Sequence, residues 1–437
     1  MLLIHVPKLT NRLGYTLNVV FQRLLRTEIG ITTDEEYFLG HEGAKVCYGH
    51  KRLGDSLFIK SHALLFQTSI EDQEPRAECR DGQWILFPTY GRDLDFGFDL
   101  LAATFYLISR YEEYLPHRED AHGRFLAEES LARRAGFLEE PVVEQWAQML
   151  RRRLQERYPD LPLAAPGYRF VQTVDIDAAW CYLHKGLFRT LMGLGRDLFV
   201  RRDPGEVRRR IRVLLRREAD PYDTCDYIIE SQKRAPGSHL LFFVLLADYG
   251  QFDKPASYLN PHMRELVQHL DDYAKMGIHP GYQSLEVPAR ADAEIKRLEA
   301  IIHRTIVRAR FHFLRLRLPR SYRILLHAGI RHDYTMGYPD APGFRAGISV
   351  QYPFYDLERD METELTIHPF CVMDTTLHES LGLSAQEGLQ RCRKLVESLR
   401  AVGGTFCCVV HNQYLADRPE WHGWRDAYGQ MLDMAKP

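Results

Sequence analysis

The stretch that decides the fold is Tyr168-Arg169-Phe170-Val171-Gln172-Thr173-Val174-Asp175-Ile176-Asp177-Ala178, an apolar strand-like run that ends in two acids one residue apart. In a strand, residues i and i+2 point to the same face, so Asp175 and Asp177 can converge on one point. Two carboxylates held together must share a proton, bind a cation or find a basic partner. Two interpretations stay open for the pair alone: solvated acids at a strand end, or part of a functional site.

Short apolar runs alternate with amphipathic stretches from this point to the end of the chain. The strands that we predict are residues 168–176, 239–246, 309–316, 324–327, 367–373 and 405–410, and the helices between them are residues 204–217, 261–276, 291–305 and 384–402. Continuous apolar strands separated by helices indicate an α/β fold, a parallel sheet or barrel covered by helices. In such folds the chemistry sits at the carboxyl ends of the strands.

The first part of the chain has a different pattern. Strand-like runs at residues 2–6, 56–59 and 84–87 mix with helical periodicity at residues 99–114 and 141–158. Residues 159–168 contain three prolines and a glycine, which is typical of a linker. We therefore predict a smaller α+β domain over residues 1–165, of undecided role, and a (β/α) barrel domain over residues 166–437.

Length and composition bound the class of protein. At 437 residues, two domains are expected, and 45% hydrophobic with 27% charged residues is typical of a globular protein with a full core. The net charge of −2 argues against a general nucleic-acid binder, and no apolar run approaches the roughly 18 residues that cross a bilayer. The start of the chain has no basic leader or cleavage site, and the eight cysteines lack metal-like spacing. We expect a cytoplasmic protein with buried thiols.

One local basic cluster stands out against this neutral background. Arginines interleave with valine and leucine at Arg201, Arg202, Arg208, Arg209, Arg210, Arg212, Arg216 and Arg217. This pattern predicts the polar face of an amphipathic helix, with an anion or membrane-surface site as the alternative.

Four further residues follow or interrupt apolar runs downstream of the Asp pair. His411 directly follows the run 405–410, His279 follows a short Gly277-Ile278 run, and His312 lies within the predicted strand 309–316. Asp and His are the ligands of a hydrolytic zinc ion that keeps one position open for water. A second carboxylate can act as general base, a histidine as general acid, and an arginine such as Arg345 can hold the base ionised.

Each of these residues also has a structural interpretation. A histidine at a strand end or in a core is often only hydrogen-bonded, Arg345 could pair with a surface acid, and Tyr334 could be packing. The site hypothesis depends on the recurrence of these residues at the strand ends of one domain.

Residues 168–437 resemble the polysaccharide deacetylases, the nodulation-type deacetylases of carbohydrate esterase family 4. The family's Thr-Phe-Asp-Asp motif is similar to Thr173-Val174-Asp175-Ile176-Asp177, and the resemblance implies a base at Asp175 and a metal ligand at Asp177. Its His-Ser/Thr-x-x-His motif maps onto His279-Pro280-Gly281-Tyr282-Gln283, where Gln283 replaces the second ligand, so His312 is the candidate replacement. The family's arginine motif is echoed by Phe344-Arg345-Ala346-Gly347, and its general-acid motif by Val409-Val410-His411-Asn412.

The whole chain is also similar to uncharacterised bacterial proteins of this family, of a Bacteroidetes-type subgroup. The shared runs are Ser109-Arg110-Tyr111-Glu112-Glu113-Tyr114-Leu115-Pro116, Gly123-Arg124-Phe125, Asp220-Pro221-Tyr222-Asp223-Thr224, Gly277-Ile278-His279-Pro280, Asp333-Tyr334-Thr335-Met336-Gly337-Tyr338, Gly343-Phe344-Arg345-Ala346-Gly347 and Val372-Met373-Asp374.

The resemblance implies a distorted parallel (β/α) barrel and a metal-dependent hydrolase that removes acetyl groups from a sugar or glycan precursor. Zinc is the expected metal, an acetylated carbohydrate is the expected partner, and Tyr282, Gln283, Tyr334 and Tyr338 are the expected substrate contacts. The alternative is a metal-poor pseudoenzyme that binds carbohydrate or acts as a scaffold, which Gln283 favours. The oligomeric state stays open.

Overall fold

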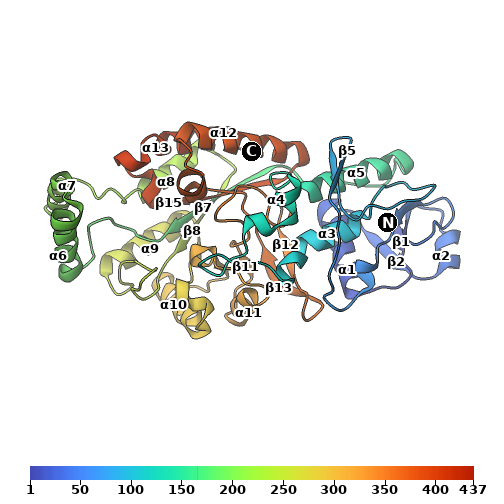
Figure 1. The fold of residues 1–437 in the computed structure, drawn as a ribbon, viewed down its shortest axis with the longest axis horizontal. Helices are drawn as coiled ribbons and strands as arrows, with labels where there is room; N and C mark the ends of the chain where they lie inside the picture. Colours follow the sequence, from blue (N-terminus) through green and yellow to red (C-terminus); the bar gives the residue numbers. More distant parts are fainter. Residues whose placement is uncertain (165) are drawn as a thin grey trace.

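The computed structural model describes residues 1–164 and 166–437, and Figure 1 shows an elongated molecule. The N-terminal part of the chain lies at one end. A helical hairpin of α6 (Leu187–Gly195) and α7 (Pro204–Leu214) projects at the other. The candidate site belongs to the sheet between these two ends.

Within the described residues, nine strands form the larger sheet. Their spatial order is β12 (Tyr352–Asp356), β13 (Met361–Ile367), β11 (His332–Asp333), β10 (Arg308–Ala309), β9 (Lys275–Ile278), β8 (His239–Val244), β7 (Arg169–Ile176), β15 (Thr405–His411) and β14 (Val372–Met373). Every neighbouring pair is parallel except β12 and β13. The predicted α/β class with a parallel sheet is confirmed. The predicted barrel is not closed by hydrogen bonds, because the ladder of described strands ends at β12 and β14.

Helices flank this sheet in Figure 1: α8 (Cys225–Ser231), α9 (Pro261–Tyr273), α10 (Pro288–Ile302), α11 (Arg320–His327), α12 (Ala385–Val402) and α13 (Trp424–Ala435). Their ends follow local sequence rules. Helices α9 and α10 begin with proline, whose missing N–H costs nothing in the first turn. Helix α12 has a capping box of Ser384 with Glu387 and ends at Gly403 in the left-handed conformation. No helix in the described part of the chain is long and apolar enough to cross a membrane.

Three of the predicted strands are confirmed as β7, β8 and β15. Residues 324–327 are wrong as a strand, because they end helix α11, where Tyr322 and Leu325 form a buried stripe at helical spacing. Of the strand predicted over residues 309–316, only Ala309 lies in a strand, the two-residue β10 (Arg308–Ala309). The chain turns after it, because Phe313 and Leu314 both adopt positive φ.

The N-terminal region has its own four-stranded sheet, ordered β2 (Ile29–Thr32), β1 (Leu2–His5), β3 (Lys45–Gly49) and β4 (Leu57–Lys60). All three pairings are parallel, which differs from the segregated α+β arrangement that we predicted. The reason is burial: every residue of β1 is buried, as expected of a parallel strand covered on both faces. A two-stranded ribbon pairs β5 (Glu78–Arg80) with β6 (Gln83–Ile85). The helices of this region are α1 (Asn11–Leu17), α2 (Glu35–Gly40), α3 (Leu100–Ile108), α4 (Leu131–Ala135) and α5 (Val142–Arg157).

Buried polar contacts join the N-terminal region to the larger sheet. The carboxylate of Glu144, on α5, accepts hydrogen bonds from the backbone N–H and hydroxyl of Ser349, both at 2.6 Å, while its second oxygen is buried without a partner. Burial raises the pKa of Glu144 to about 7. Ionisation of this side chain therefore opposes folding.

We expect Glu144→Gln to remove a pH dependence of stability. The folded pKa lies above the unfolded value near 4.5, so wild type loses stability as pH rises from about 4.5 to about 7. Between pH 5 and pH 8, wild type should lose roughly 2–3 kcal/mol that Glu144→Gln keeps. Chemical denaturation of both proteins at the two pH values measures the difference. Identical pH dependence in the two proteins would contradict the assignment.

Candidate active site

The carboxyl ends of the central strands meet at one cleft of about 420 Å³. Asp175, near the end of β7, is paired in register with His411 at the end of β15. Asp177 follows β7, and His279 follows β9. The cleft is lined by these four side chains and by His312. Five of the residues predicted from sequence are thus brought together.

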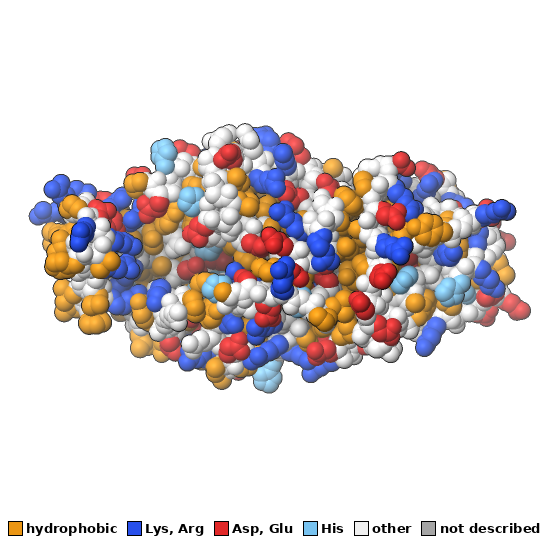
Figure 2. All heavy atoms as spheres, viewed as in Figure 1, with side chains coloured by type: hydrophobic (Ala, Val, Ile, Leu, Met, Phe, Trp, Pro, Cys, Tyr) orange, Lys and Arg blue, Asp and Glu red, His pale blue; other side chains and the backbone are white. Residues whose placement is uncertain are grey.

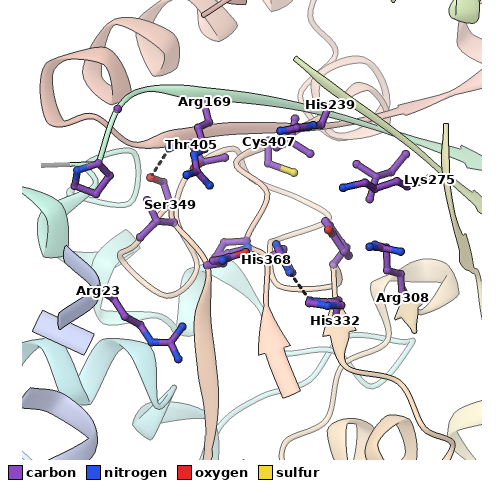
Figure 3. A pocket seen from close by; sticks show the side chains of 18 of the residues that line it. Arg23, Arg169, His239, Lys275, Arg308, His332, Ser349, His368, Thr405 and Cys407 are labelled. Atoms are coloured by element: carbon purple, nitrogen blue, oxygen red, sulfur yellow. Dashed lines mark hydrogen bonds between the residues drawn. The ribbon is translucent and has the colours of Figure 1, made fainter. Parts of the chain in front are cut away.

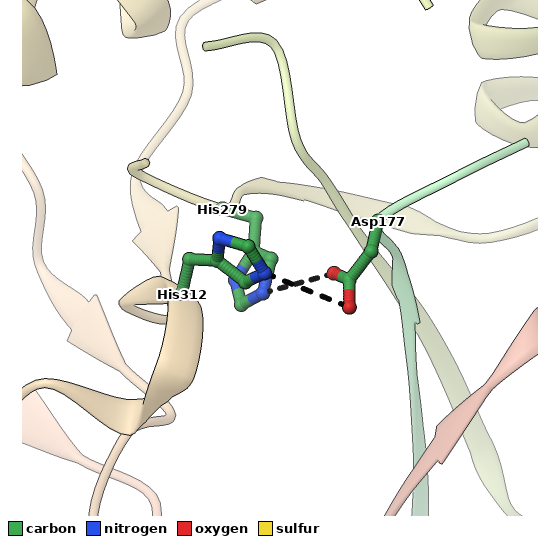
Figure 4. A group of neighbouring side chains, drawn as sticks. All are labelled: Asp177, His279 and His312. Carbon is green, nitrogen blue, oxygen red and sulfur yellow. Dashed lines mark ion pairs between the residues drawn. The ribbon is translucent and has the colours of Figure 1, made fainter. Parts of the chain in front are cut away.

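Asp177, His279 and His312 form a group with the geometry of a metal site. Figure 4 shows both imidazole rings turned toward the carboxylate of Asp177. The Nε2 atoms of His279 and His312 lie 3.3 and 3.7 Å from the two carboxylate oxygens, and one ligand atom of each residue lies within 4.8 Å of the others. Ligand atoms about 2.0–2.1 Å from one tetrahedral zinc ion would be about 3.3 Å apart.

The donor set fits a divalent metal ion. Oδ1 of Asp177 is buried and has no hydrogen-bond partner. Burial opposes ionisation of Asp177, but the positive charge of His312 and the close approach of both imidazoles hold its pKa well below its usual range. An ionised carboxylate with an unpartnered oxygen between two imidazoles is what a bound cation would complete, so these three residues could hold one.

Backbone and carboxylate partners fix both imidazole rings. Nδ1 of His279 lies 2.6 Å from the carbonyl oxygen of Arg310, and Nδ1 of His312 lies 2.7 Å from Oδ1 of Asp253. In each ring the other nitrogen, Nε2, is therefore left to face Asp177. Such partners orient ligating histidines in metal proteins.

We expect Asp253→Ala to weaken metal binding by about 10- to 100-fold, since the His312 ring loses the partner that orients it. Titration with zinc in competition with a chelator measures the change. Asp248→Ala is the matched control, because Asp248 lies in the same connection but is exposed and pairs with Arg297. Equal zinc affinity in wild type and Asp253→Ala would contradict the role given to Asp253.

Arg310, rather than Arg345, is the arginine at Asp175. Its Nη1 donates to Oδ1 of Asp175 at 2.6 Å, its Nη2 donates to Thr173 Oγ1 at 2.7 Å, and its side chain is fully buried. Arg345 instead makes a buried pair with Glu113 at 2.7 and 2.8 Å. The expectation that Arg345 orients the base is therefore not met. Although burial opposes ionisation, Arg345 and Arg110 lower the pKa of Glu113 to about 2, so this cluster ties the N-terminal region to the larger sheet.

His411 lies on the side of Asp177 away from the β9 end, with its Nε2 3.8 Å from Oδ2 of that carboxylate. Asp374, just after β14, accepts from the backbone N–H of His411 at 2.6 Å and lies 2.7 Å from its Nδ1. Burial disfavours the charged imidazole, but the Asp374 carboxylate outweighs it and raises the pKa of His411 to about 10. A protonated histidine with its Nε2 in the cleft is suited to give a proton away.

The predicted substrate contacts lie outside this cleft. Tyr282 and Gln283 line a neighbouring pocket, Tyr334 lines a pocket at the opposite ends of the strands, and Tyr338 is buried against Arg110. The described residues that line the cleft instead include the aromatic rings of Phe252, Phe313 and Tyr414, together with His122 and Arg124 from the N-terminal region. The N-terminal region therefore forms part of the cleft wall.

Sequence reasoning missed three residues that hold the site. Arg310 lies in a predicted strand and carries no motif, and Asp253 lies in an irregular connection with no sequence signal. Asp374 ends the run Val372-Met373-Asp374, which suggested family likeness without a role. Partners of this kind are defined by contacts across the fold.

Comparisons with known proteins give one family match and several weak structural likenesses. A model described as a family of unknown function, DUF7033, matches residues 2–159. No curated protein matches the chain.

Three solved structures share 10–13% identity with the chain and cover 61% of it. Two are described as polysaccharide deacetylases, from Mycobacterium smegmatis (13% identity, TM-score 0.37) and Pseudomonas aeruginosa PAO1 (10%, 0.36), and 83% of each is covered. The third is a 4-alpha-glucanotransferase from Thermococcus litoralis (10%, 0.34), of which 37% is covered. TM-scores this low decide neither fold nor activity, so the assignment below rests on the side chains of the cleft.

Proposed function

We propose that this protein is a metal-dependent hydrolase that removes acetyl groups from an acetylated sugar or glycan precursor. The observation that carries the proposal is the convergence of Asp177, His279 and His312 on one point between Asp175 and His411. A metal-ligand group, a buried carboxylate and a protonated histidine around one cleft are the parts that hydrolysis of an amide or ester needs.

Asp177, His279 and His312 would hold the ion, with zinc the metal that suits two imidazoles and a carboxylate. A bound zinc ion polarises a carbonyl oxygen and makes water a stronger nucleophile at neutral pH. The same three side chains line the cleft, where a substrate acetyl group can enter.

The two flanking groups supply the proton transfers. Asp175 accepts the proton of the attacking water, and Arg310 fixes the orientation of this carboxylate by a 2.6 Å hydrogen bond. His411 donates a proton to the departing amine or alcohol, and Asp374 holds its ring in place. Asp175 and His411 occupy paired positions in the β7–β15 register, so base and acid lie side by side at the cleft, where both can reach one acetyl group.

The shape of the cleft supports a sugar substrate. Its walls carry three aromatic rings, Phe252, Phe313 and Tyr414, which can pack on the apolar face of a pyranose. Arg124 and Lys254 add hydrogen-bond donors for ring hydroxyls. A cleft of about 420 Å³ accommodates one or two sugar units.

Acetate release tests the proposal. The protein is freed of metal, reconstituted with zinc and incubated with N-acetylated and O-acetylated sugars and short oligosaccharides. We expect acetate from at least one of these classes, dependent on added metal. Tight carbohydrate binding without acetate release from any of them would favour the pseudoenzyme alternative and overturn the enzyme.

The pseudoenzyme alternative lost its main support. It rested on Gln283 replacing a metal ligand, but Gln283 lines a different pocket and His312 stands next to His279, with ring centroids 5.0 Å apart. These positions support our inference that His312 takes the place of the missing ligand.

A further inference from the structure

A second large cavity lies at the amino ends of the same strands, opposite the candidate active site. Its volume is about 480 Å³, within the range of small-molecule sites. Figure 3 shows basic side chains from several strands directed into it. The proposed hydrolysis does not use this basal pocket.

The basic residues follow a rule of position. Five neighbouring parallel strands, β7 to β11, each begin with a basic residue that lines the pocket: Arg169, His239, Lys275, Arg308 and His332. Because the amino ends of parallel strands meet at one edge of the sheet, these five basic side chains lie around the same pocket opening. His368 adds a third imidazole, and Arg23 and Arg26 reach the pocket from the N-terminal region.

Among the described residues, the walls of the pocket carry no matching negative charge. No Asp or Glu is among the described residues that line it. Arg23 also interacts with Glu362 of β13, so part of its charge is compensated there. Burial, together with the positive charges of His332, Arg308 and Lys275, lowers the pKa of His368 to about 3. An excess of cations held around a hollow costs free energy unless an anion is bound there.

We propose that the basal pocket binds a compact small-molecule polyanion, with phosphate groups as the anionic part. Arginine guanidinium groups pair with phosphate oxygens through two parallel hydrogen bonds, and Lys275 supplies a point charge. Arg23 and Arg26 give the N-terminal region a share in this site. The proposal does not depend on the hydrolase activity.

Tripolyphosphate is the probe, titrated calorimetrically at about 0.15 M salt, where weak surface pairing is screened. We expect saturable binding of one probe per chain and at least tenfold weaker binding in Lys275→Ala/Arg308→Ala. Lys296→Ala, an exposed lysine on α10, is the matched control and should bind as wild type does. Metal stripping by this chelating probe would be equal in all variants and cannot produce that difference.

A parallel titration with citrate separates phosphate from carboxylate recognition, and we expect citrate to bind at least tenfold more weakly. Equal or tighter citrate binding would overturn the phosphate assignment. Absence of saturable binding of either probe, or equal binding by the double variant, would overturn the site.

A different observation concerns the projecting hairpin. From Leu187 to Arg217 the chain has ten arginines and three acidic residues. On α6 and the π-helical segment that continues it (Arg196–Arg201), the side chains of Phe188, Phe199 and Val200 are each about three-quarters exposed. Leu187, Leu191, Met192 and Leu198 are also exposed, and none of the residues of α6 is buried.

In the first arm of the hairpin, α6 and residues 196–201, the apolar side chains face outward, which is the reverse of an ordinary surface helix. The buried side chains of the hairpin are the apolar Val213 of α7 and an ion pair, Arg210 to Asp197 at 2.6 Å, with Arg210 also over the ring of Tyr182. The apolar residues 187, 188, 191, 192, 198 and 199 recur at helical spacing on one stripe that faces outward. Figure 2 shows hydrophobic and basic side chains gathered at the end of the molecule where Figure 1 labels α6 and α7.

We infer that this hairpin binds the surface of an anionic lipid bilayer. The exposed stripe of Phe, Leu and Met can enter the acyl boundary, while the surrounding arginines pair with anionic headgroups. The net charge of +7 between residues 187 and 217 favours a negatively charged partner. The apolar stripe favours a partner with an apolar interior, and an anionic bilayer has both properties. This is the choice that the sequence left open for its basic cluster.

Sedimentation with vesicles of phosphatidylglycerol and phosphatidylcholine tests the inference. We expect binding to mixed vesicles, at least tenfold weaker binding to pure phosphatidylcholine, and loss of binding in Phe188→Ser/Phe199→Ser. Tyr37→Ser/Leu39→Ser, which changes exposed apolar residues near the opposite end, is the matched control and should still bind.

Equal vesicle binding by wild type and Phe188→Ser/Phe199→Ser would overturn the inference. A second result would also overturn it: no vesicle binding by wild type, together with a wild-type dimer that becomes a monomer in this variant. The stripe would then be a protein interface. Acetate release on a water-soluble substrate should be unchanged in the variant, which separates this surface from the catalytic proposal.

Discussion

Asp175→Asn should lower kcat for acetate release by about a thousandfold or more while zinc binding stays stoichiometric. Removal of a general base typically costs 10²- to 10⁴-fold, and the amide cannot accept the proton of the attacking water. Shape is conserved, and the amide oxygen can still accept the hydrogen bond that Arg310 now gives to Asp175. The change therefore acts on charge and basicity with little repacking.

Steady-state kinetics and metal analysis of the same preparation measure both quantities. Asp272→Asn, an exposed acid on α9, is the matched control and should have wild-type kcat. Retained acetate release in Asp175→Asn would remove this residue as the base. Loss of zinc together with activity would instead make Asp175 a metal ligand and reverse the split of roles between the two acids.

Arg310→Gln should lower kcat by about a hundredfold or more, again with zinc retained. The guanidinium group makes three contacts that no other side chain can replace: the Asp175 carboxylate at 2.6 Å, the Thr173 hydroxyl at 2.7 Å and the Tyr334 carbonyl at 2.9 Å. Without it, the buried Asp175 carboxylate loses the charge-assisted hydrogen bond that fixes its orientation. Arg310→Lys keeps the charge and should recover part of kcat.

Arg345→Gln separates this role from that of an ordinary buried arginine. Loss of the Arg345 guanidinium leaves Glu113 without one of its two cationic partners, and breaking a buried pair typically costs about 3–5 kcal/mol of stability. We expect this variant to unfold at lower denaturant concentration and to keep near-normal kcat while folded. A large loss of kcat in folded Arg345→Gln, with none in Arg310→Gln, would restore the assignment suggested by the family motif.

The sequence predicted the main strands because their signals are local. The runs that became β7, β8 and β15 are continuous and apolar, as parallel strands buried on both faces must be. The strand prediction failed where the backbone conformation ends a strand. After Ala309 the chain turns at two residues with positive φ, so His312 reaches the site from a turn. No hydrophobic pattern encodes that turn.

The residues of the candidate site likewise fall into those that the sequence predicted and those that it did not. Asp175, Asp177, His279 and His411 sit at or just after strand ends, and their convergence follows from parallel topology. Arg345 and the tyrosines were misplaced, because the choice between a buried ion pair and a catalytic contact depends on partners far away in sequence, such as Glu113. For the same reason the role of Arg310 was not predicted, although Arg310 lies only two positions before His312 in the chain.

The central claim is that His312, with Asp177 and His279, completes a metal site from which the family's second histidine is missing. Metal content after zinc reconstitution, measured by mass spectrometry on wild type, His312→Ala and Gln283→Ala, tests it most directly. We predict about one zinc per chain in wild type and in Gln283→Ala, and less than about a tenth of that in His312→Ala. A wild type without stoichiometric zinc, or a His312→Ala variant that keeps its zinc while Gln283→Ala loses it, would contradict the account.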